Sequence, residues 1–435
     1  MRPITIVGAG QIGSMVAWRL LRSGKPVRVI DAGTVHDRPD QQSPWGWYRR
    51  ISLQPDSKMS RSPKLELAFP EAKSTRGSML ITTTSDTTLD SWRNWIISRR
   101  SVTDAYVMTP TVASQNFGLN RSFWQENNID QGGVFVCDSR DFLIDFNSLN
   151  NHLWDYIKKH PNCEFMEDTS VQSIECNPNT NRATALVAEC GGEQRHYEID
   201  QTLFCIGNKS IDVLPHMHPP ILRVTLPYTT SIRPYYVETN STLPWSSVWN
   251  SNSTLIRCKD GTVKLGCGTR SMISLQKLHY HMGGIRNALP FLGMAMRNNI
   301  LFNSTIETQW DYSREKLLQE AASEIDSLLN CNLTMDLTMN SAALWNPDQC
   351  TVDLTPTLSP VVDYLPYAKN ILLATGLSGS GSIALEEWFY EAIASSLEMD
   401  YIHPQLHTFR RLSIWENWFP HDIYTSPISS MGRQL

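Results

Sequence analysis

The sequence predicts an α/β fold in which a parallel sheet built from both ends of the chain is interleaved with an antiparallel sheet plus helices. Near the N-terminus, a β-branched run at Ile4–Val7, an apolar helical pattern at Ser14–Arg22 and a second strand ending at Asp31 indicate a βαβ unit. Near the C-terminus, the apolar strand Asn370–Thr375 precedes a helix with an apolar stripe at Ile383–Leu397. Strands of this type at both ends predict one domain contributed by both termini, with the other inserted between.

The elements between these ends are predicted in chain order. A helix is expected at Trp92–Ile97, and an apolar strand near Phe135 leads into a helical pattern that ends at Ile157. Short strands follow at Val171–Glu175, Ala183–Glu189, His196–Ile199 and Leu203–Ile206. A strand-rich region then covers Leu222–Cys267, and a helical and irregular block covers Leu275–Asn330.

Composition and charge exclude several classes of protein. The chain has 435 residues, of which 41% are hydrophobic and 19% charged, so it is globular and not disordered. A net charge of −5 argues against a nucleic-acid partner. No apolar window is long enough for a membrane span, and no signal peptide precedes Ile4, so we expect a cytoplasmic protein without membrane contact. The nine cysteines form no Cys-x-x-Cys pair, and the His-x-His pairs lack acidic or cysteine partners, so no metal site is expected.

The motif Gly8-Ala9-Gly10-Gln11-Ile12-Gly13 lies between the first strand and the first helix. Gly8 permits the tight turn, Gly10 lets the backbone approach a pyrophosphate, and Gly13 allows close packing of helix and strand. Asp31 ends the second strand, where a carboxylate can accept both ribose hydroxyls of an adenosine. The pattern predicts dinucleotide binding but does not distinguish FAD from NAD(P). The predicted binding set also contains Gln11, Ile12 and Val171.

Three further segments resemble the D-amino-acid oxidase superfamily of FAD enzymes. The strand and turn Ile371–Gly381 resemble the C-terminal flavin-binding signature, which implies that Gly376, Ser378, Gly379 and Gly381 meet the flavin. Gly132–Val136 resembles the family's central Gly-Gly-Val strand, and Leu203–Asn208 resembles the strand whose glycine, here Gly207, closes over the dinucleotide. The resemblance implies a Rossmann-type FAD-binding domain and an antiparallel substrate domain.

Within this superfamily the pattern is most similar to monomeric sarcosine oxidase and its relatives. Cys350 is followed five and six residues later by Thr355-Pro356, as in the family segment whose cysteine is joined to the flavin. Val352 and Thr357 depart from that pattern. A covalent FAD on Cys350 and a buried structural cysteine are therefore both open interpretations.

The same resemblance implies two catalytic residues. Lys264 lies where the family places the lysine that activates oxygen, because a fixed ammonium stabilises the negative charge that develops on O₂. Arg49 lies where the family places an arginine against the flavin face. The alternatives are a solvated lysine on an edge strand and a surface arginine in a loop.

Departures from the sarcosine oxidase pattern bear on the substrate. The two positions that clamp a substrate carboxylate in that family are occupied by Ser52 and Ile383, and neither can form a charged fork. A histidine expected after the oxygen-activating lysine is replaced by Gly268. We therefore expect a larger or less acidic amine than sarcosine, unless Arg50 or Arg270 supplies the missing charge.

The sequence thus predicts an FAD-dependent oxidase that converts an amine or amino-acid-like molecule to an imine while O₂ becomes H₂O₂. The expected FAD-binding domain comprises residues 1–85, 140–225 and 340–400, the substrate domain 86–139 and 226–339, and a C-terminal extension 401–435. A monomer or homodimer is expected. The alternatives are a flavin dehydrogenase or tailoring oxidase with another acceptor, a non-catalytic flavin-binding subunit and, third, an NAD(P)-dependent reductase.

Overall fold

The structure is a computed structural model of the 435-residue chain. It describes the side chains of residues 2–33, 148–207, 362–365, 368–375, 389–399 and 401–404 with a few single positions, and the backbone of the further strands and helix ends given below. The predicted helix at Trp92–Ile97 lies outside the described residues.

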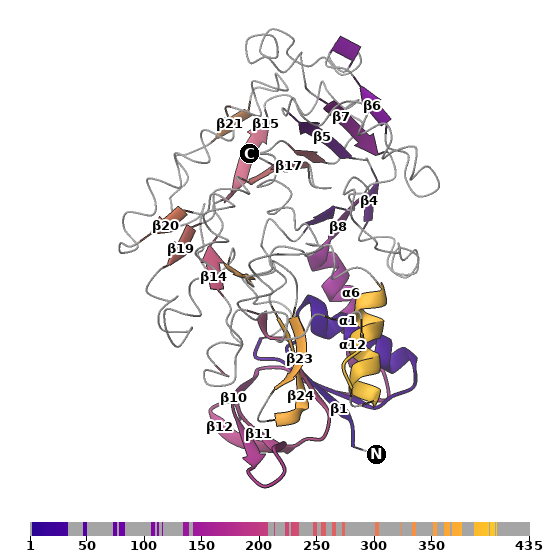
Figure 1. The fold of residues 1–435 in the computed structure, drawn as a ribbon, viewed down its shortest axis with the longest axis vertical. Helices are drawn as coiled ribbons and strands as arrows, with labels where there is room; N and C mark the ends of the chain where they lie inside the picture. The colour runs from indigo at the N-terminus through magenta and orange to yellow at the C-terminus, as the bar shows by residue number, and fades with distance from the viewer. Residues whose placement is uncertain are drawn as a thin grey trace.

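A six-stranded sheet is the centre of the half of the molecule that contains the N-terminus (Figure 1). Its order is β23-β24-β13-β1-β2-β9, in which the last five strands are parallel and β23 is antiparallel to β24. The strands are β1 (Ile4–Val7), β2 (Val27–Ile30), β9 (Cys163–Met166), β13 (Thr202–Phe204), β23 (Val361–Leu365) and β24 (Ala368–Thr375). Strands from both ends and the middle of the chain therefore share one sheet, which confirms the predicted α/β class.

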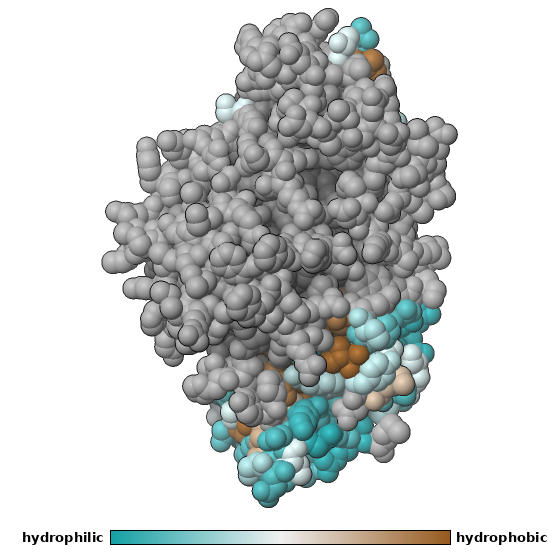
Figure 2. Space-filling view, viewed as in Figure 1, coloured by the Kyte–Doolittle hydropathy of each residue, from teal (hydrophilic) through white to brown (hydrophobic). Residues whose placement is uncertain are grey.

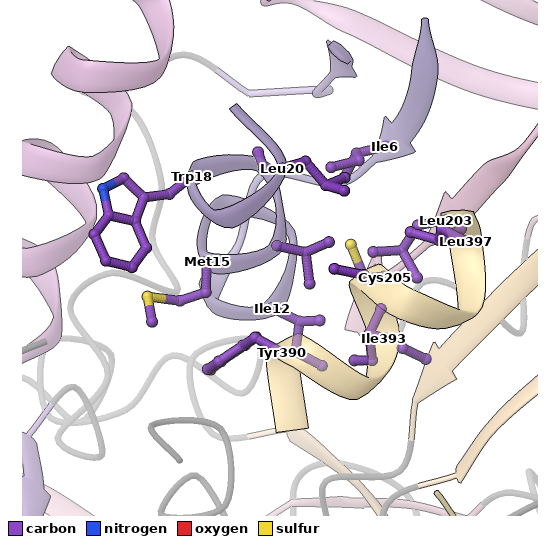
Figure 3. Close-up of a cluster of buried hydrophobic side chains, with 14 of the residues drawn as sticks. Ile6, Ile12, Met15, Trp18, Leu20, Leu203, Cys205, Tyr390, Ile393 and Leu397 are labelled. Atoms are coloured by element: carbon purple, nitrogen blue, oxygen red, sulfur yellow. The ribbon is translucent and has the colours of Figure 1, made fainter. Parts of the chain in front are cut away.

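Three helices pack on one face of this sheet: α1 (Gln11–Arg22), α6 (Phe146–Lys159) and α12 (Glu387–Met399). The strands read as apolar runs because both faces are buried, as parallel sheets require. Alternate residues of β1 and β13 point to opposite faces, with Ile6 and Leu203 in the cluster beneath the helices and Val7 and Phe204 in a second cluster. The helix-side cluster includes Tyr390 of α12 and residues of α1 (Figure 3).

The opposite face is covered by the three-stranded meander β10 (Thr169–Asn177), β11 (Arg182–Cys190) and β12 (Glu193–Glu198). β10 and β11 place Val171 and Leu186 against the sheet, whereas β12 is largely exposed. The described surface over this region is mainly hydrophilic on the face shown in Figure 2. This half of the molecule thus has three layers: the helices, the mainly parallel sheet and the antiparallel meander.

The remaining strands form three other sheets, which Figure 1 places above the parallel sheet. An eight-stranded sheet has the order β21-β15-β18-β17-β16-β5-β7-β6, a four-stranded sheet β20-β19-β14-β22, and a three-stranded sheet β3-β8-β4. The bounds are β3 (Trp47–Arg49), β4 (Lys73–Thr75), β5 (Ser78–Thr82), β6 (Tyr106–Met108), β7 (Val134–Asp138), β8 (Phe142–Asp145), β14 (Leu222–Thr225), β15 (Tyr228–Pro234), β16 (Ser247–Trp249), β17 (Thr254–Arg257), β18 (Val263–Gly266), β19 (Met272–Ser274), β20 (Leu301–Asn303), β21 (Leu333–Met335) and β22 (Thr351–Leu354).

Two features of these sheets differ from the prediction. The eight-stranded sheet is antiparallel except where β16 pairs in parallel with β5, because these strands come from different insertions and no hairpin fixes their relative direction. The block predicted as helical and irregular contains β20, which pairs in parallel with β19. The helix at the C-terminus is confirmed as Glu387–Met399.

Candidate functional site

The turn between β1 and α1 can be formed only with glycine at two positions. Gly8 has φ +97, and a Cβ there would lie 2.8 Å from the Cys205 carbonyl oxygen. A Cβ on Gly13 would lie 1.8 Å from the Gly8 carbonyl oxygen and 2.9 Å from Cys205 Sγ. The first turn of α1 is therefore pressed against the end of β1, as the sequence motif predicts.

Gly10 serves a different purpose from these two residues. Its φ of −66 and ψ of −165 are accessible to any residue, and a Cβ there would meet no atom within 4 Å. Gly10 is the N-cap of α1 and provides no side-chain hydrogen bond to the helix. The first N–H groups of a helix have no acceptor within it and carry partial positive charge, so this end is suited to a diphosphate.

Two further predicted residues, Gln11 and Ile12, form the start of α1. Gln11 is half-buried. Ile12 is 7% exposed, and its side chain belongs to the apolar core beneath the helices (Figure 3). Only its backbone N–H could therefore donate to a ligand at the turn.

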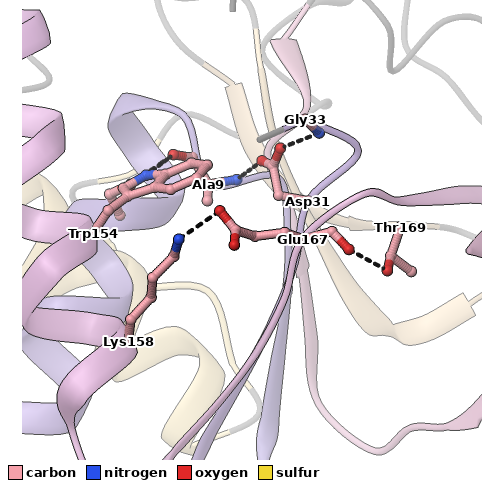
Figure 4. A network of polar contacts seen from close by, with 8 residues as sticks. Ala9, Asp31, Gly33, Trp154, Lys158, Glu167 and Thr169 are labelled. Carbon is pink, nitrogen blue, oxygen red and sulfur yellow. Dashed lines mark hydrogen bonds and ion pairs between the residues drawn. The ribbon is translucent and has the colours of Figure 1, made fainter. Parts of the chain in front are cut away.

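Asp31 lies directly behind the turn. The residue is 6% exposed, and its Oδ2 accepts a hydrogen bond from the Ala9 N–H at 2.5 Å while Oδ1 accepts one from the Gly33 N–H at 2.8 Å (Figure 4). A carboxylate oxygen can accept more than one hydrogen bond. The carboxylate is therefore fixed at the end of β2, where the sequence places the ribose-binding group.

Two residues that the sequence does not indicate hold the carbonyl group of Ala9. The Ala9 carbonyl accepts hydrogen bonds from the Ser14 hydroxyl at 2.7 Å and from Trp154 Nε1 at 2.8 Å. The Trp154 indole N–H also lies 3.0 Å from Ser14 Oγ. Trp154 belongs to α6, more than a hundred residues away, so no local pattern could have indicated the contact.

Neighbouring strands deliver other predicted residues to this edge of the sheet. The parallel pairing of β1, β13 and β24 brings their carboxyl ends together, so the chain leaves β24 at Thr375 beside the glycine turn. Gly207 follows β13 with φ +58, which favours glycine. Val171 pairs with Ala188 and is buried in the second core cluster.

The two predicted catalytic residues lie on different sheets. Arg49 ends β3 and pairs with Leu143 of β8, while Lys264 lies in β18 and pairs with Ile256 of β17. β18 is flanked by β15 on its other side, so the alternative interpretation of Lys264 as an edge-strand residue is wrong. The sequence around β17 and β18 does not indicate that β18 is an interior strand, because its second neighbour, β15, lies outside the β17–β18 hairpin.

Several predicted positions lie outside the described residues. These are Cys350, immediately before β22, and the turn residues Gly376, Ser378, Gly379 and Gly381, which follow β24. Within the part of the chain that the structure describes, no group of three metal-ligating side chains occurs. No helix among the described residues is long and apolar enough to cross a membrane.

The residues at the turn fit the diphosphate and adenosine half of FAD. The open space at Gly10, the uncapped α1 N-terminus and the fixed Asp31 carboxylate supply, respectively, room, N–H donors and a ribose acceptor. Such a turn accepts NAD(P) equally well, so the distinction between the cofactors comes from whole-chain comparison.

Comparison with known proteins makes that distinction. Residues 3–384 match the family model of FAD dependent oxidoreductases. No curated protein sequence matches the chain significantly.

Solved structures with a similar fold have low sequence identity. An L-proline dehydrogenase from P. horikoshii has a TM-score of 0.64 and 14% identity over 94% of this chain and 97% of its own. An L-amino acid deaminase from Proteus myxofaciens has a TM-score of 0.64 and 13% identity over 92% and 90%. A fructosamine oxidase from Aspergillus fumigatus has a TM-score of 0.64 and 15% identity over 96% and 92%.

The family match covers most of the chain, and the glycine turn and strand order are those that such a cofactor needs. The predicted FAD cofactor and enzyme class are thereby confirmed over the nicotinamide alternative. The chain belongs to the family of FAD dependent oxidoreductases.

Proposed function

We propose that the enzyme oxidises a C–N bond of an amine or amino-acid-like small molecule to an imine and passes the electrons to O₂, which becomes H₂O₂. The substrate loses two electrons and two protons, and O₂ gains both. The observation that carries this proposal is the glycine turn with its fixed Asp31 carboxylate in a chain of the FAD dependent oxidoreductase family.

FAD, when bound, supplies the acceptor for the hydride of the substrate's α-carbon. The chain's own residues bind and orient it. The α1 N-terminus with Gly10 would hold the diphosphate, Asp31 the adenosine ribose, and the segment from Gly376 to Gly381 the flavin end. Val171 and Gly207 complete the predicted set.

Lys264 is the residue that we assign to oxygen activation, with Arg49 against the flavin face. Support comes from the resemblance of Lys264-Leu265-Gly266 to the strand that carries the family's oxygen-activating lysine. β18 lies between β15 and β17. A fixed ammonium would stabilise the negative charge that develops as O₂ is reduced.

The Lys264 assignment is tested with the dithionite-reduced protein, which needs no known substrate. Air-saturated buffer is mixed with reduced wild type and Lys264→Met, and the return of visible flavin absorbance is followed. We expect at least a tenfold slower reoxidation in Lys264→Met, because one preorganised charge contributes about 10²–10³ in comparable sites. Equal rates would remove Lys264 from the mechanism.

The same experiment separates the second candidate function, a dehydrogenase or tailoring oxidase with another acceptor. This candidate is favoured by the similarity to a solved L-proline dehydrogenase. Slow reoxidation of the wild type by air, with fast reoxidation by an artificial quinone, would support it. If the wild type takes up FAD but no amine reduces it, the proposed oxidation of an amine is refuted.

Covalent attachment of FAD through Cys350 belongs to the same proposal. Acid precipitation of the purified protein would leave flavin colour in the pellet of the wild type and release it to the supernatant in Cys350→Ala. Colour in the supernatant of the wild type would show that FAD is not covalently attached and would remove Cys350 from the cofactor site.

The substrate is proposed from the two positions without charge, Ser52 and Ile383. Neither can form a bidentate pair with a carboxylate, so we infer a larger or less acidic amine than sarcosine. The domain boundaries given above, the monomeric or homodimeric state and the cytoplasmic location remain predictions.

A further inference from the structure

Both backbone polar groups of Ala9, its N–H and its carbonyl, are held by side chains. Asp31 accepts from its N–H, and the Trp154 indole donates to its carbonyl (Figure 4). The Ser14 hydroxyl donates to the same carbonyl. Ala9 is itself fully buried. These contacts come from the residue after β2, from α1 and from α6, so the position of the Ala9 backbone is defined by the tertiary structure and not by the turn alone.

Trp154 is kept in place independently of Ala9. Its side chain is 1% exposed, and its ring lies 5.0 Å from the Phe165 ring of β9. The Lys158 ammonium lies 5.5 Å from the centre of the indole and is 2.5 Å from the Glu167 carboxylate. The indole N–H therefore points at the turn from a packed and charge-stabilised position.

The Ala9 carbonyl determines the orientation of the following N–H groups. The peptide that joins Ala9 to Gly10 is planar and trans, so fixing the Ala9 carbonyl inward fixes the Gly10 N–H in the opposite direction. A Cβ on Gly10 would meet no atom within 4 Å. Glycine has more conformations available than any other residue, and Gly8 and Gly10 flank Ala9. Without a restraint on Ala9, the turn would populate conformations that cannot bind a diphosphate.

We propose that Trp154 is a positioning residue for FAD: its indole N–H, together with the Ser14 hydroxyl, holds the Ala9 carbonyl and preorganises the glycine turn for the diphosphate. The inference rests on FAD binding, as the proposed function does. Because Trp154 acts at the diphosphate end, it sets the affinity for FAD and not the reactivity of the bound flavin. The apparent dissociation constant rises when the competent turn is only fractionally populated.

The test compares Trp154→Phe with the matched control Trp18→Phe. Trp18 is also a buried tryptophan, 6% exposed, on α1, where the Arg22 guanidinium lies 4.8 Å from its ring. Both changes are made in the Cys350→Ala background, in which FAD binding is reversible whatever the role of that cysteine. The apoproteins are titrated with FAD, and their peptides covering residues 4–21 are followed by hydrogen exchange.

We expect Trp154→Phe to raise the FAD dissociation constant about three- to tenfold, as the loss of one buried hydrogen bond allows. Exchange in the 4–21 peptide should be faster in this apoprotein, and reoxidation of the FAD-saturated reduced protein should be unchanged. Trp18→Phe should leave the FAD dissociation constant within about twofold of that of the parent, because sites without shared contacts act nearly independently. Ser14→Ala provides a second variant if Trp154→Phe does not fold.

The inference is overturned if Trp154→Phe or Ser14→Ala binds FAD like the parent, or if both tryptophan variants weaken binding equally, which would indicate a general effect on packing. A parent protein that binds no FAD would instead refute the proposed function. In that case the hydrogen-exchange comparison still decides whether Trp154 restrains the turn.

Discussion

Replacing Gly13 with alanine is expected to damage both the stability and the FAD binding of the protein. The new Cβ would lie 1.8 Å from the Gly8 carbonyl oxygen, whereas real Cβ atoms essentially never approach another atom closer than 3.0 Å. The obstacle is backbone and cannot rotate away, so the start of α1 must move by about 1 Å.

The magnitude follows from what α1 buries. Four of its large apolar side chains are at most 3% exposed: Met15, Val16, Leu20 and Leu21. Each contributes about 2 kcal/mol by burial. A gap of 0.5–1 Å forfeits about a quarter to a half of the contact energy. The expected loss is therefore about 2–4 kcal/mol.

Gly10→Ala is the matched control, because its Cβ meets no atom within 4 Å and its backbone dihedrals suit alanine. Thermal unfolding of the apoproteins should show a fall of several degrees for Gly13→Ala and no significant change for Gly10→Ala. Titration with FAD should show weaker binding in both variants, because the alanine methyl at position 10 occupies the space that we assign to the diphosphate.

Equal thermal stability of Gly13→Ala and wild type would refute the close approach of α1 and β1. Unchanged FAD affinity of Gly10→Ala would refute the assignment of this space to the cofactor.

Three further predictions concern the same half of the molecule. In Asp31→Asn the new amide NH₂ would face one of the two backbone N–H groups that the carboxylate now accepts from, so FAD titration should show at least about tenfold weaker binding. Unchanged FAD affinity would exclude Asp31 as the group that binds the adenosine ribose. Asn370→Ala removes the side chain that donates to and accepts from Ala183, so denaturant unfolding should show a loss of about 2–4 kcal/mol, and a loss below 1 kcal/mol would contradict this. Burial, and then the negative Glu164, raise the pKa of the Cys163 thiol to about 12. In the unfolded chain the thiol ionises near pH 9, so its contribution to stability is complete below that pH and is lost as the pH rises towards 12. Alkylation of Cys163 at pH 9, located by peptide mass spectrometry, should therefore be slow in the native protein and fast after denaturation. Fast labelling of Cys163 in the native protein would contradict the raised pKa.

The parts of the fold that could be predicted are those with local signals. The β1–α1–β2 unit follows from hydrophobic periodicity and from glycines whose steric need the structure confirms at Gly8 and Gly13. β9 and β23 were not predicted, because a short strand at the edge of a sheet has little sequence signal beyond a few apolar residues. The order of strands from three distant segments depends on tertiary pairing.

The candidate site shows the same division. Asp31 could be predicted from its spacing after the glycine motif. Trp154 could not, because a tryptophan in an amphipathic helix is most often a core residue and its hydrogen bond to Ala9 joins two distant elements. The interior place of Lys264 also depends on a strand, β15, that the turn before β18 does not indicate.

The most direct test of the account is the visible absorbance spectrum of the purified protein, recorded anaerobically before and after addition of a panel of primary and secondary amines, and again after admission of air. The account predicts a flavin spectrum that at least one amine bleaches, with recovery in air and one H₂O₂ formed per amine oxidised. A protein that has no flavin spectrum and takes up no added FAD would contradict it.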